Sequence, residues 1–277
     1  MSDCGKNWRG VLSLLLLGPF LLAVFVPFLW MVLGMFKTNA EFFQPMAKAF
    51  FPVNYDWQNV AELLEGRSVP FWAVFGNSLI VSLGQALGAV ALSAAAGYAF
   101  ARFSFSGKRV LFVLAVALIL VPRQLFAVPL YTWVNALGLM DNLLGVILPG
   151  IVTGLGVIYF TQVFRQMPEE YLQAARISGA PEFRVFMTVL PLVCPALVSY
   201  GMIHFILAWH EHLIPMLVLS ETNQTLPVAL AKLRDVSYRT PEGVQMAAST
   251  FAVIPTAVLF ALCHRKFKSS LSDMLVH

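Results

Sequence analysis

The stretch that decides the fold runs from Pro70 to Ala101 and reads PFWAVFGNSLIVSLGQALGAVALSAAAGYAFA. It holds no charged residue, and at about 1.5 Å of rise per residue a helix of this length exceeds the roughly 30 Å of hydrocarbon in a bilayer. Its apolar residues do not alternate with polar ones, so a helix is favoured over a strand of a membrane barrel. The stretch therefore predicts a transmembrane helix, and its small residues, Gly97 among them, are expected to let other helices approach closely.

The whole chain shares this apolar character. Of its 277 residues, 59% are hydrophobic and only 12% are charged, against roughly 25% charged in typical soluble domains. The mean hydropathy is +0.77, and a soluble fold of this length could not bury so much apolar surface. Three Cys and the lack of long basic runs argue against a disulfide scaffold and against nucleic acid as a partner. The chain is predicted to be an integral protein of the lipid bilayer.

Six stretches of this kind predict an all-α integral membrane protein with six transmembrane helices. The predicted spans are 11–36, 70–101, 110–133, 143–164, 190–219 and 244–263. Lys6 and Arg9 precede the first span as they would in a signal peptide. The uncharged run is longer than the roughly 7–15 apolar residues of a signal peptide, which favours a retained anchor.

The basic residues outside the spans predict the orientation, because Lys and Arg favour the cytoplasmic side. With both termini inside, eleven of them are cytoplasmic: Lys6, Arg9, Arg102, Lys108, Arg109, Arg165, Arg176, Arg184, Arg265, Lys266 and Lys268. Six are then outside: Lys37, Lys48, Arg67, Lys232, Arg234 and Arg239. Both termini are therefore expected to be cytoplasmic. Segments 1–10, 165–189 and 264–277 then lie inside, and segments 37–69 and 220–243 lie outside.

The inner segment 165–189 carries signals for two helices. Pro168 suits the first position of a helix, and Glu169 and Glu170 place negative charge at the positive end of its dipole. Gly179 fits a left-handed stop, and Pro181 begins a second start signal. Two short helices joined at a glycine are predicted.

One face of the first of these helices is narrow. Leu172, Ala175 and Gly179 fall on a single stripe, which a partner could approach closely. The alternative that these features leave open is a loop that only connects two spans.

The same segment resembles the cytoplasmic signature of membrane subunits of binding-protein-dependent ABC importers. That signature is Glu-Ala-Ala, three residues, Gly, and a hydrophobic stretch that ends in Leu-Pro. Here it reads Gln173-Ala174-Ala175, Arg176-Ile177-Ser178, Gly179 and then Leu190-Pro191. Gln173 replaces the usual Glu, and Ser178 replaces the Asp that commonly precedes the Gly. Ordered matches elsewhere resemble the carbohydrate-uptake group of maltose type: Phe36 to Asn39, Asn77-Ser78, Gly97 to Arg102, Val128 to Tyr131 and Leu137 to Leu139.

The resemblance implies a type I ABC importer permease fold in the prokaryotic inner membrane. It further implies a second homologous permease subunit, an ATPase dimer at the cytoplasmic face, and a soluble binding protein that meets segments 37–69 and 220–243, the latter by insertion into its cleft. The solute would be a carbohydrate or a related compound. The residues implied in coupling to the ATPase are Glu169, Glu170, Leu172, Gln173, Ala174, Ala175, Ser178 and Gly179.

The chemistry would then belong to the partner. ATP and Mg²⁺ are expected on the ATPase subunits, and this chain is expected to bind no cofactor and to be no enzyme. Its sequence holds no Gly-x-x-x-x-Gly-Lys-Ser/Thr loop, which is the usual cradle for nucleotide phosphates.

Polar groups inside the spans are costly in lipid and indicate a substrate path. The candidates are Asn77, Arg123, Trp209, His210 and Glu211. Arg123 follows Pro122, where the third helix is expected to kink or break, although it could instead extend to the membrane interface. His210, Glu211 and His212 are about 100° apart around a helix, and no His-Glu-x-x-His occurs, so no metal site is predicted.

A self-contained secondary transporter or channel is the alternative function. Such proteins commonly carry internal repeats or lines of ionisable residues within the membrane, and neither is visible here. A membrane enzyme would need acid, base or metal groups that converge, whereas the polar groups here are isolated. The residues do not distinguish a sugar from a polyol or glycerol phosphate as the solute.

Overall fold

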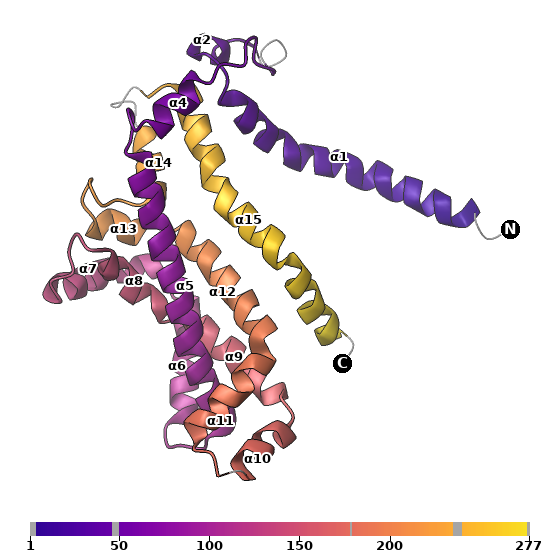
Figure 1. Cartoon of the computed structure of the whole chain (residues 1–277), viewed down its shortest axis with the longest axis vertical. Helices are drawn as coiled ribbons and strands as arrows, with labels where there is room; N and C mark the ends of the chain where they lie inside the picture. The colour runs from indigo at the N-terminus through magenta and orange to yellow at the C-terminus, as the bar shows by residue number, and fades with distance from the viewer. Residues whose placement is uncertain (1–3, 46–49, 178, 235–239, 276–277) are drawn as a thin grey trace. The chain divides into compact units, whose positions relative to one another are not determined.

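The structure is a computed structural model that describes residues 4–45, 50–177, 179–234 and 240–275, and these residues form helices and no strands (Figure 1). Four helices are long and apolar enough to cross a membrane: Leu17–Gly34, Phe71–Arg102, Glu182–Trp209 and Glu242–Cys263. Two bent pairs of shorter helices bring the described spans to as many as six if each pair counts as one.

The helices follow one another in this order and with these bounds: α1 Cys4–Gly34, α2 Asn39–Phe42, α4 Gln58–Leu64, α5 Phe71–Arg102, α6 Lys108–Leu120, η1 Arg123–Phe126, α7 Ala127–Ala136, α8 Leu143–Ile151, α9 Gly154–Gln166, α10 Glu169–Ile177, α11 Glu182–Val189, η2 Leu190–Val193, α12 Cys194–Trp209, α13 Leu213–Val218, α14 Leu226–Leu233 and α15 Glu242–Leu275. The chain divides into two compact units. The first comprises residues 1–72 and 230–254, and the second comprises residues 73–229 and 255–277.

In the first unit, the segment after α1 is held by buried polar contacts. Lys37 is buried, and its Nζ lies 3.4 Å from the centroid of the Trp30 ring. Asn59 on α4 donates hydrogen bonds to the carbonyl oxygens of Met35 and Lys37 at 3.0 and 2.8 Å. Part of the predicted outer segment 37–69 is therefore folded against the residues that end α1.

Glu41 organises the rest of this segment. Its carboxylate accepts hydrogen bonds from the backbone and the hydroxyl of Thr38, which closes a capping box on α2, and from the backbone of Val53 at 2.7 Å. Burial raises the pKa of Glu41, but these hydrogen bonds and the charge of Lys37 outweigh it and hold the pKa below its ordinary value. The ionised carboxylate thus joins α2 to Val53.

The second unit is built around α5. At Gly97 the backbone of α9 comes so close that an added Cβ would lie 2.5 Å from the Cβ of Phe160 and 2.8 Å from the amide nitrogen of Thr161. Only a residue without a side chain fits this approach. The prediction that Gly97 lets a neighbouring helix approach is confirmed.

Three of the predicted spans are interrupted, and stretch 190–219 is one of them, because the chain leaves the helix between the end of α12 at Trp209 and the start of α13 at Leu213. Stretch 110–133 comprises α6 and then η1 with α7, which are bent by 104° relative to α6. α6 ends at Leu120, and Val121 takes an extended conformation at φ −86° and ψ 121° because the ring of Pro122 disfavours the helical region for the residue before it. Stretch 143–164 comprises α8 and α9, which are bent by 45° at a break after Ile151. The break at Pro122 is the one that the sequence predicts.

Candidate functional site

Segment 165–189 forms two short helices, α10 and α11, at one end of α5 (Figure 1). α10 has Glu169 and Glu170 in its first turn, and α11 begins directly after Pro181. Gly179 lies between them with φ +75°, and its amide donates to the carbonyl oxygen of Arg176 at 2.9 Å. This left-handed conformation favours glycine. These are the two helices and the glycine stop that the sequence predicts.

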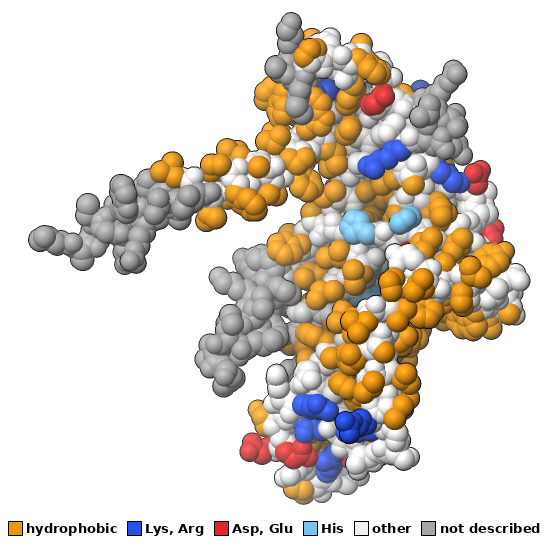
Figure 2. Space-filling model, turned by 180° about the vertical axis from the view of Figure 1, so that it is seen from behind, with side chains coloured by type: hydrophobic (Ala, Val, Ile, Leu, Met, Phe, Trp, Pro, Cys, Tyr) orange, Lys and Arg blue, Asp and Glu red, His pale blue; other side chains and the backbone are white. Residues whose placement is uncertain are grey.

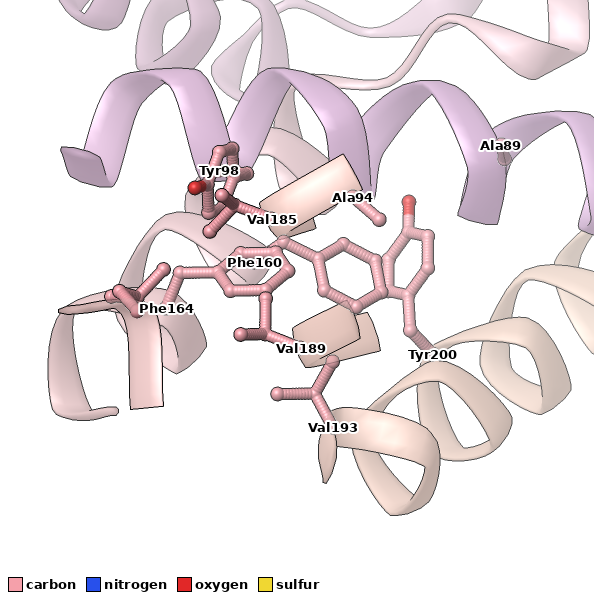
Figure 3. Close-up of a cluster of buried hydrophobic side chains, with 10 residues drawn as sticks. Ala89, Ala94, Tyr98, Phe160, Phe164, Val185, Val189, Val193 and Tyr200 are labelled. Carbon is pink, nitrogen blue, oxygen red and sulfur yellow. The ribbon is translucent and has the colours of Figure 1, made fainter. Parts of the chain in front are cut away.

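An apolar cluster holds both helices against α5 and α9 (Figure 3). Leu172 of α10 and Val185 of α11 are fully buried together with Phe160 and Phe164 of α9, and Ala175 packs against the same cluster. The stripe through Leu172 and Ala175 therefore faces the core of the chain itself. The prediction that a partner approaches this stripe is wrong for Leu172 and Ala175, because these two residues supply apolar area that attaches α10. Gly179, the third residue of the stripe, is exposed.

Large apolar side chains are exposed elsewhere on these two helices. Ile177 at the end of α10 is 87% exposed, and Phe183 on α11 is 74% exposed. Tyr171 and Met187 are exposed as well. Exposed apolar residues concentrated on one short segment indicate a surface that a protein partner or the membrane covers. We call these four residues the apolar docking surface.

The polar residues predicted to couple to an ATPase lie on the same two-helix segment. Glu169, Glu170, Gln173 and Gly179 are exposed. Ala174 is described by its backbone alone, and Ser178 lies outside the described residues.

Arg102, the last residue of α5, ties α10 to the rest of the second unit. Its Nη1 lies 2.6 Å from Oε2 of Glu169 in an ion pair, and its side chain is only 12% exposed. Its Nη2 donates hydrogen bonds to the carbonyl oxygens of Phe164 and Met167, both at 2.6 Å. Sequence reasoning did not assign a role to Arg102, although it ends the family match that begins at Gly97.

Arg176 extends this contact to α11. Its Nε donates to Oε1 of Glu182 at 2.7 Å, and its Nη1 pairs with Oε1 of Glu169 at 3.1 Å. The hydroxyl of Tyr98 on α5 donates to Oε2 of Glu182 at 3.0 Å. The hydrogen bond to Glu182 raises the pKa of the Arg176 guanidinium despite partial burial, so it is charged at every physiological pH. A continuous series of polar contacts thus runs from α5 to α10, on to α11, and back to α5. We call its members the charge chain: Arg102, Glu169, Arg176, Glu182 and Tyr98.

The residues predicted to line a substrate path do not form one site, but two of them meet. Nη1 of Arg123 lies 3.6 Å from Oε2 of Glu211, which is an ion pair too long for a hydrogen bond. The other oxygen of Glu211 accepts a hydrogen bond from the amide of Leu213 at 2.9 Å. The pair joins the break after α6 to the break between α12 and α13, two points where the helical spans are interrupted.

Trp209 and His210 lie at the end of α12 in different surroundings. Trp209 is buried, with its ring centroid 5.6 Å from that of Phe75 and 5.7 Å from that of Phe205. His210 is exposed. Within the described part of the chain, no group of three or more His, Cys, Asp or Glu side chains is placed to hold a metal ion.

Asn77 contacts the segment that leads into α14. Its Nδ2 donates to the carbonyl oxygens of Asn223 and Gln224 at 3.0 and 3.2 Å, and Oγ of Ser78 accepts from the amide of Leu226 at 2.7 Å. The first part of the predicted outer loop 220–243 is therefore anchored on α5 rather than free, and residues 235–239 lie outside the described residues.

Comparison with known proteins relates this architecture to a family. The model of the family described as "Binding-protein-dependent transport system inner membrane component" matches residues 89–272, which include α10, α11 and the whole charge chain. The chain belongs to this family. It is thus a multi-pass protein of the bacterial inner membrane and a component of a transport system rather than an enzyme. The predicted family and localisation are confirmed.

Several relatives of this inner membrane component are permease proteins. The chain is 30% identical to the arabinooligosaccharides transport system permease protein AraQ of Bacillus subtilis (strain 168), over 96% of this chain and 94% of the relative. It is 29% identical to the lactose transport system permease protein LacG of Rhizobium radiobacter, over 92% and 91%. It is 28% identical to the sn-glycerol-3-phosphate transport system permease protein UgpE of Yersinia pestis bv. Antiqua (strain Antiqua), over 97% and 98%.

A solved structure shares the fold of this inner membrane component. It is a crystal structure of a bacterial ABC transporter involved in the import of the acidic polysaccharide alginate. The two chains match with a TM-score of 0.82 at 20% identity, over 96% of this chain and 98% of the other. The predicted permease fold is confirmed.

Proposed function

We propose that this inner membrane component forms half of the translocation pathway of an ATP-driven importer and that a second, homologous permease subunit forms the other half. An ATPase dimer, which would carry ATP and Mg²⁺, binds α10 and α11 at the cytoplasmic face. A soluble binding protein delivers the solute on the opposite side. The apolar docking surface of α10 and α11 carries this proposal, because four large apolar side chains are exposed on a segment whose other stripe already packs inward.

The charge chain supplies a mechanical connection for this function. When ATP closes the ATPase dimer, the dimer binds one arrangement of the permease better than the other and shifts the equilibrium toward it. A movement of α10 then reaches α5 through Arg102 and Glu169, and a movement of α11 reaches α5 through Glu182 and Tyr98. Both termini lie in the cytoplasm in this arrangement, as the distribution of Lys and Arg favours.

The proposed solute is a carbohydrate or a compound derived from one. Relatives of similar identity are named for arabinooligosaccharides, for lactose and for glycerol 3-phosphate, which share a polyhydroxylated carbon chain. The ion pair of Arg123 and Glu211 is the group that we place beside the solute path, because it joins two interrupted spans and Arg123 is half exposed.

Reconstitution tests the proposal against a self-contained transporter or channel. The chain is produced with its partner permease and ATPase, purified in mild detergent and placed in vesicles, and the same is done with the chain alone. We expect uptake of a radiolabelled sugar only in vesicles that hold the full assembly, the binding protein and ATP. Accumulation or leakage through the lone chain would show that the function is wrong.

A further inference from the structure

A cavity of about 680 Å³ lies between the end of α5, the loop that follows it, the start of α6 and the end of α9. Three cations line it: Lys108 and Arg109 begin α6, and Arg165 lies in the last turn of α9. Nζ of Lys108 donates to the carbonyl oxygen of Phe103 at 2.7 Å. Among the residues that the structure describes, none of the three cations has a carboxylate within ion-pair distance. The cavity therefore holds three positive charges that these residues do not neutralise.

Aromatic rings form the apolar part of the lining. The ring of Phe100 lies 5.6 Å from that of Phe105 and 5.8 Å from that of Phe112, measured between centroids. The guanidinium of Arg165 lies 5.8 Å from the centroid of Phe112. A ligand that fits this cavity has an anionic group next to an apolar part.

The surface of α6 continues this pattern away from the cations. No residue of α6 is buried, and Val110, Leu114 and Leu118, which share one stripe, are 63%, 53% and 53% exposed. Figure 2 shows Lys and Arg side chains gathered at the lower end of the face in view, with apolar side chains above them. Cations at the end of an exposed apolar helix match the boundary between lipid headgroups and acyl chains.

We propose that this cavity binds the phosphate of an anionic phospholipid headgroup, with the acyl chains along the exposed stripe of α6. A free phosphate would neutralise the cations but would leave the apolar stripe of α6 uncovered. We therefore assign the site to a lipid. The cavity lies at the end of α5 that carries Arg102 and α10, and its place in the cytoplasmic leaflet rests on the proposed orientation. The bound lipid would hold the turn between α5 and α6 next to the end of α9. The end of α9 directly precedes α10 in the chain.

Native mass spectrometry of the assembled transporter in non-ionic detergent tests this site. Phosphatidylglycerol, phosphatidylcholine and inorganic phosphate are titrated separately into the wild type and three variants. The neutral variant carries Lys108→Gln, Arg109→Gln and Arg165→Gln, and the charge-conserving variant carries Lys108→Arg, Arg109→Lys and Arg165→Lys. The matched control, Arg67→Gln with Arg184→Gln and Arg234→Gln, removes three exposed cations outside the cavity.

We expect phosphatidylglycerol to bind the neutral variant roughly 100-fold more weakly than the wild type, because each basic residue near an anionic membrane surface contributes severalfold to binding. The charge-conserving variant and the matched control should bind it like the wild type, and millimolar phosphate should not displace it. Equal binding by the neutral variant and the matched control would overturn the proposal. Displacement of the lipid by phosphate would also overturn the proposal, because it indicates a free-phosphate site. Absence of lipid from the assembly would overturn it too, because it indicates that a partner subunit covers the cavity. These results do not depend on uptake, so they are separate from the test of the proposed function.

Discussion

Arg102 fastens α10 to α5 and α9 through an ion pair and two backbone hydrogen bonds. Hydrogen bonds to charged groups contribute roughly 1.5–3 kcal/mol each. Arg102→Gln should therefore lower the free energy of local opening of α10 by about 2 kcal/mol. Hydrogen exchange of the α10 amides should become roughly 30-fold faster, and ATP-driven uptake should fall with it.

Arg184→Gln is the control for this change, because Arg184 is an exposed cation on α11 that forms no ion pair with the described residues. It should leave the exchange of the α10 amides unchanged. Arg102→Lys keeps the charge but loses the forked geometry, so it should recover only part of the attachment. Unchanged exchange in Arg102→Gln would show that α10 is held by the apolar cluster alone.

Glu41 predicts a dependence on pH in the first unit. Its pKa lies below the ordinary 4.5 in the folded chain. Its contribution to stability is therefore full above that ordinary value and is lost as the pH falls through the lower, folded value. Exchange of the Val53 amide, corrected for the intrinsic rate, should accelerate below about pH 4.5 in the wild type, and Glu41→Gln should show fast exchange with no such dependence. Identical pH profiles for the two proteins would contradict the role of this carboxylate.

The sequence predicts which residues are candidates for a functional role better than it predicts which side chains they contact. Leu172 is among the residues that the family resemblance implies in coupling, but its burial depends on Phe160 and Phe164 of α9, which no local pattern places beside it. The sequence indicates Arg123 and Glu211 only as two separate polar groups in apolar spans. That they meet at 3.6 Å follows only from the breaks in both spans.

At the scale of elements, Gly179 sets the angle between α10 and α11. Its φ is +75°, and an added Cβ would meet nothing within 4 Å among the described atoms. A tryptophan there should therefore block the ATPase while the chain still folds. We expect Gly179→Trp to abolish uptake and the stimulation of the partner's ATPase, and Gly179→Asn, which tolerates this conformation, to retain most of both.

Gly138 provides a matched control, since its φ is +69° and its surroundings are equally open. Gly138→Trp imposes the same backbone strain, of about 1–2 kcal/mol, away from α10. It should leave ATPase stimulation intact. If Gly138→Trp and Gly179→Trp lose stimulation equally, strain rather than docking explains the defect.

The elements themselves are predicted unevenly. Apolar length and the proline and glycine signals suffice for α5, α10 and α11, because these depend on local composition and on helix ends. Pro122 indicates the break after α6, but the bend of 104° is set by what η1 and α7 pack against. The break between α8 and α9 has weaker signals, which are Pro149 near the end of α8 and Thr153 as the N-cap of α9.

The whole molecule is one component of a transport system. Its sequence carries no phosphate loop, and α10 and α11 expose apolar side chains outside the predicted spans. The family signature and the distribution of charge indicate which side of the membrane this surface faces, and both can be predicted from sequence. The inward packing of Leu172 and Ala175 could not be predicted, since it needs the tertiary contacts of α9.

Site-specific photocrosslinking in native membranes tests whether an ATPase subunit covers the apolar docking surface. A photoactivatable residue replaces Ile177, which is 87% exposed on α10, and in a control chain it replaces Val128, which is 73% exposed on α7. We expect position 177 to capture an ATPase subunit, identified by mass spectrometry, and position 128 to capture none. Capture of no ATPase at position 177, in membranes where the chain supports uptake, would contradict this expectation.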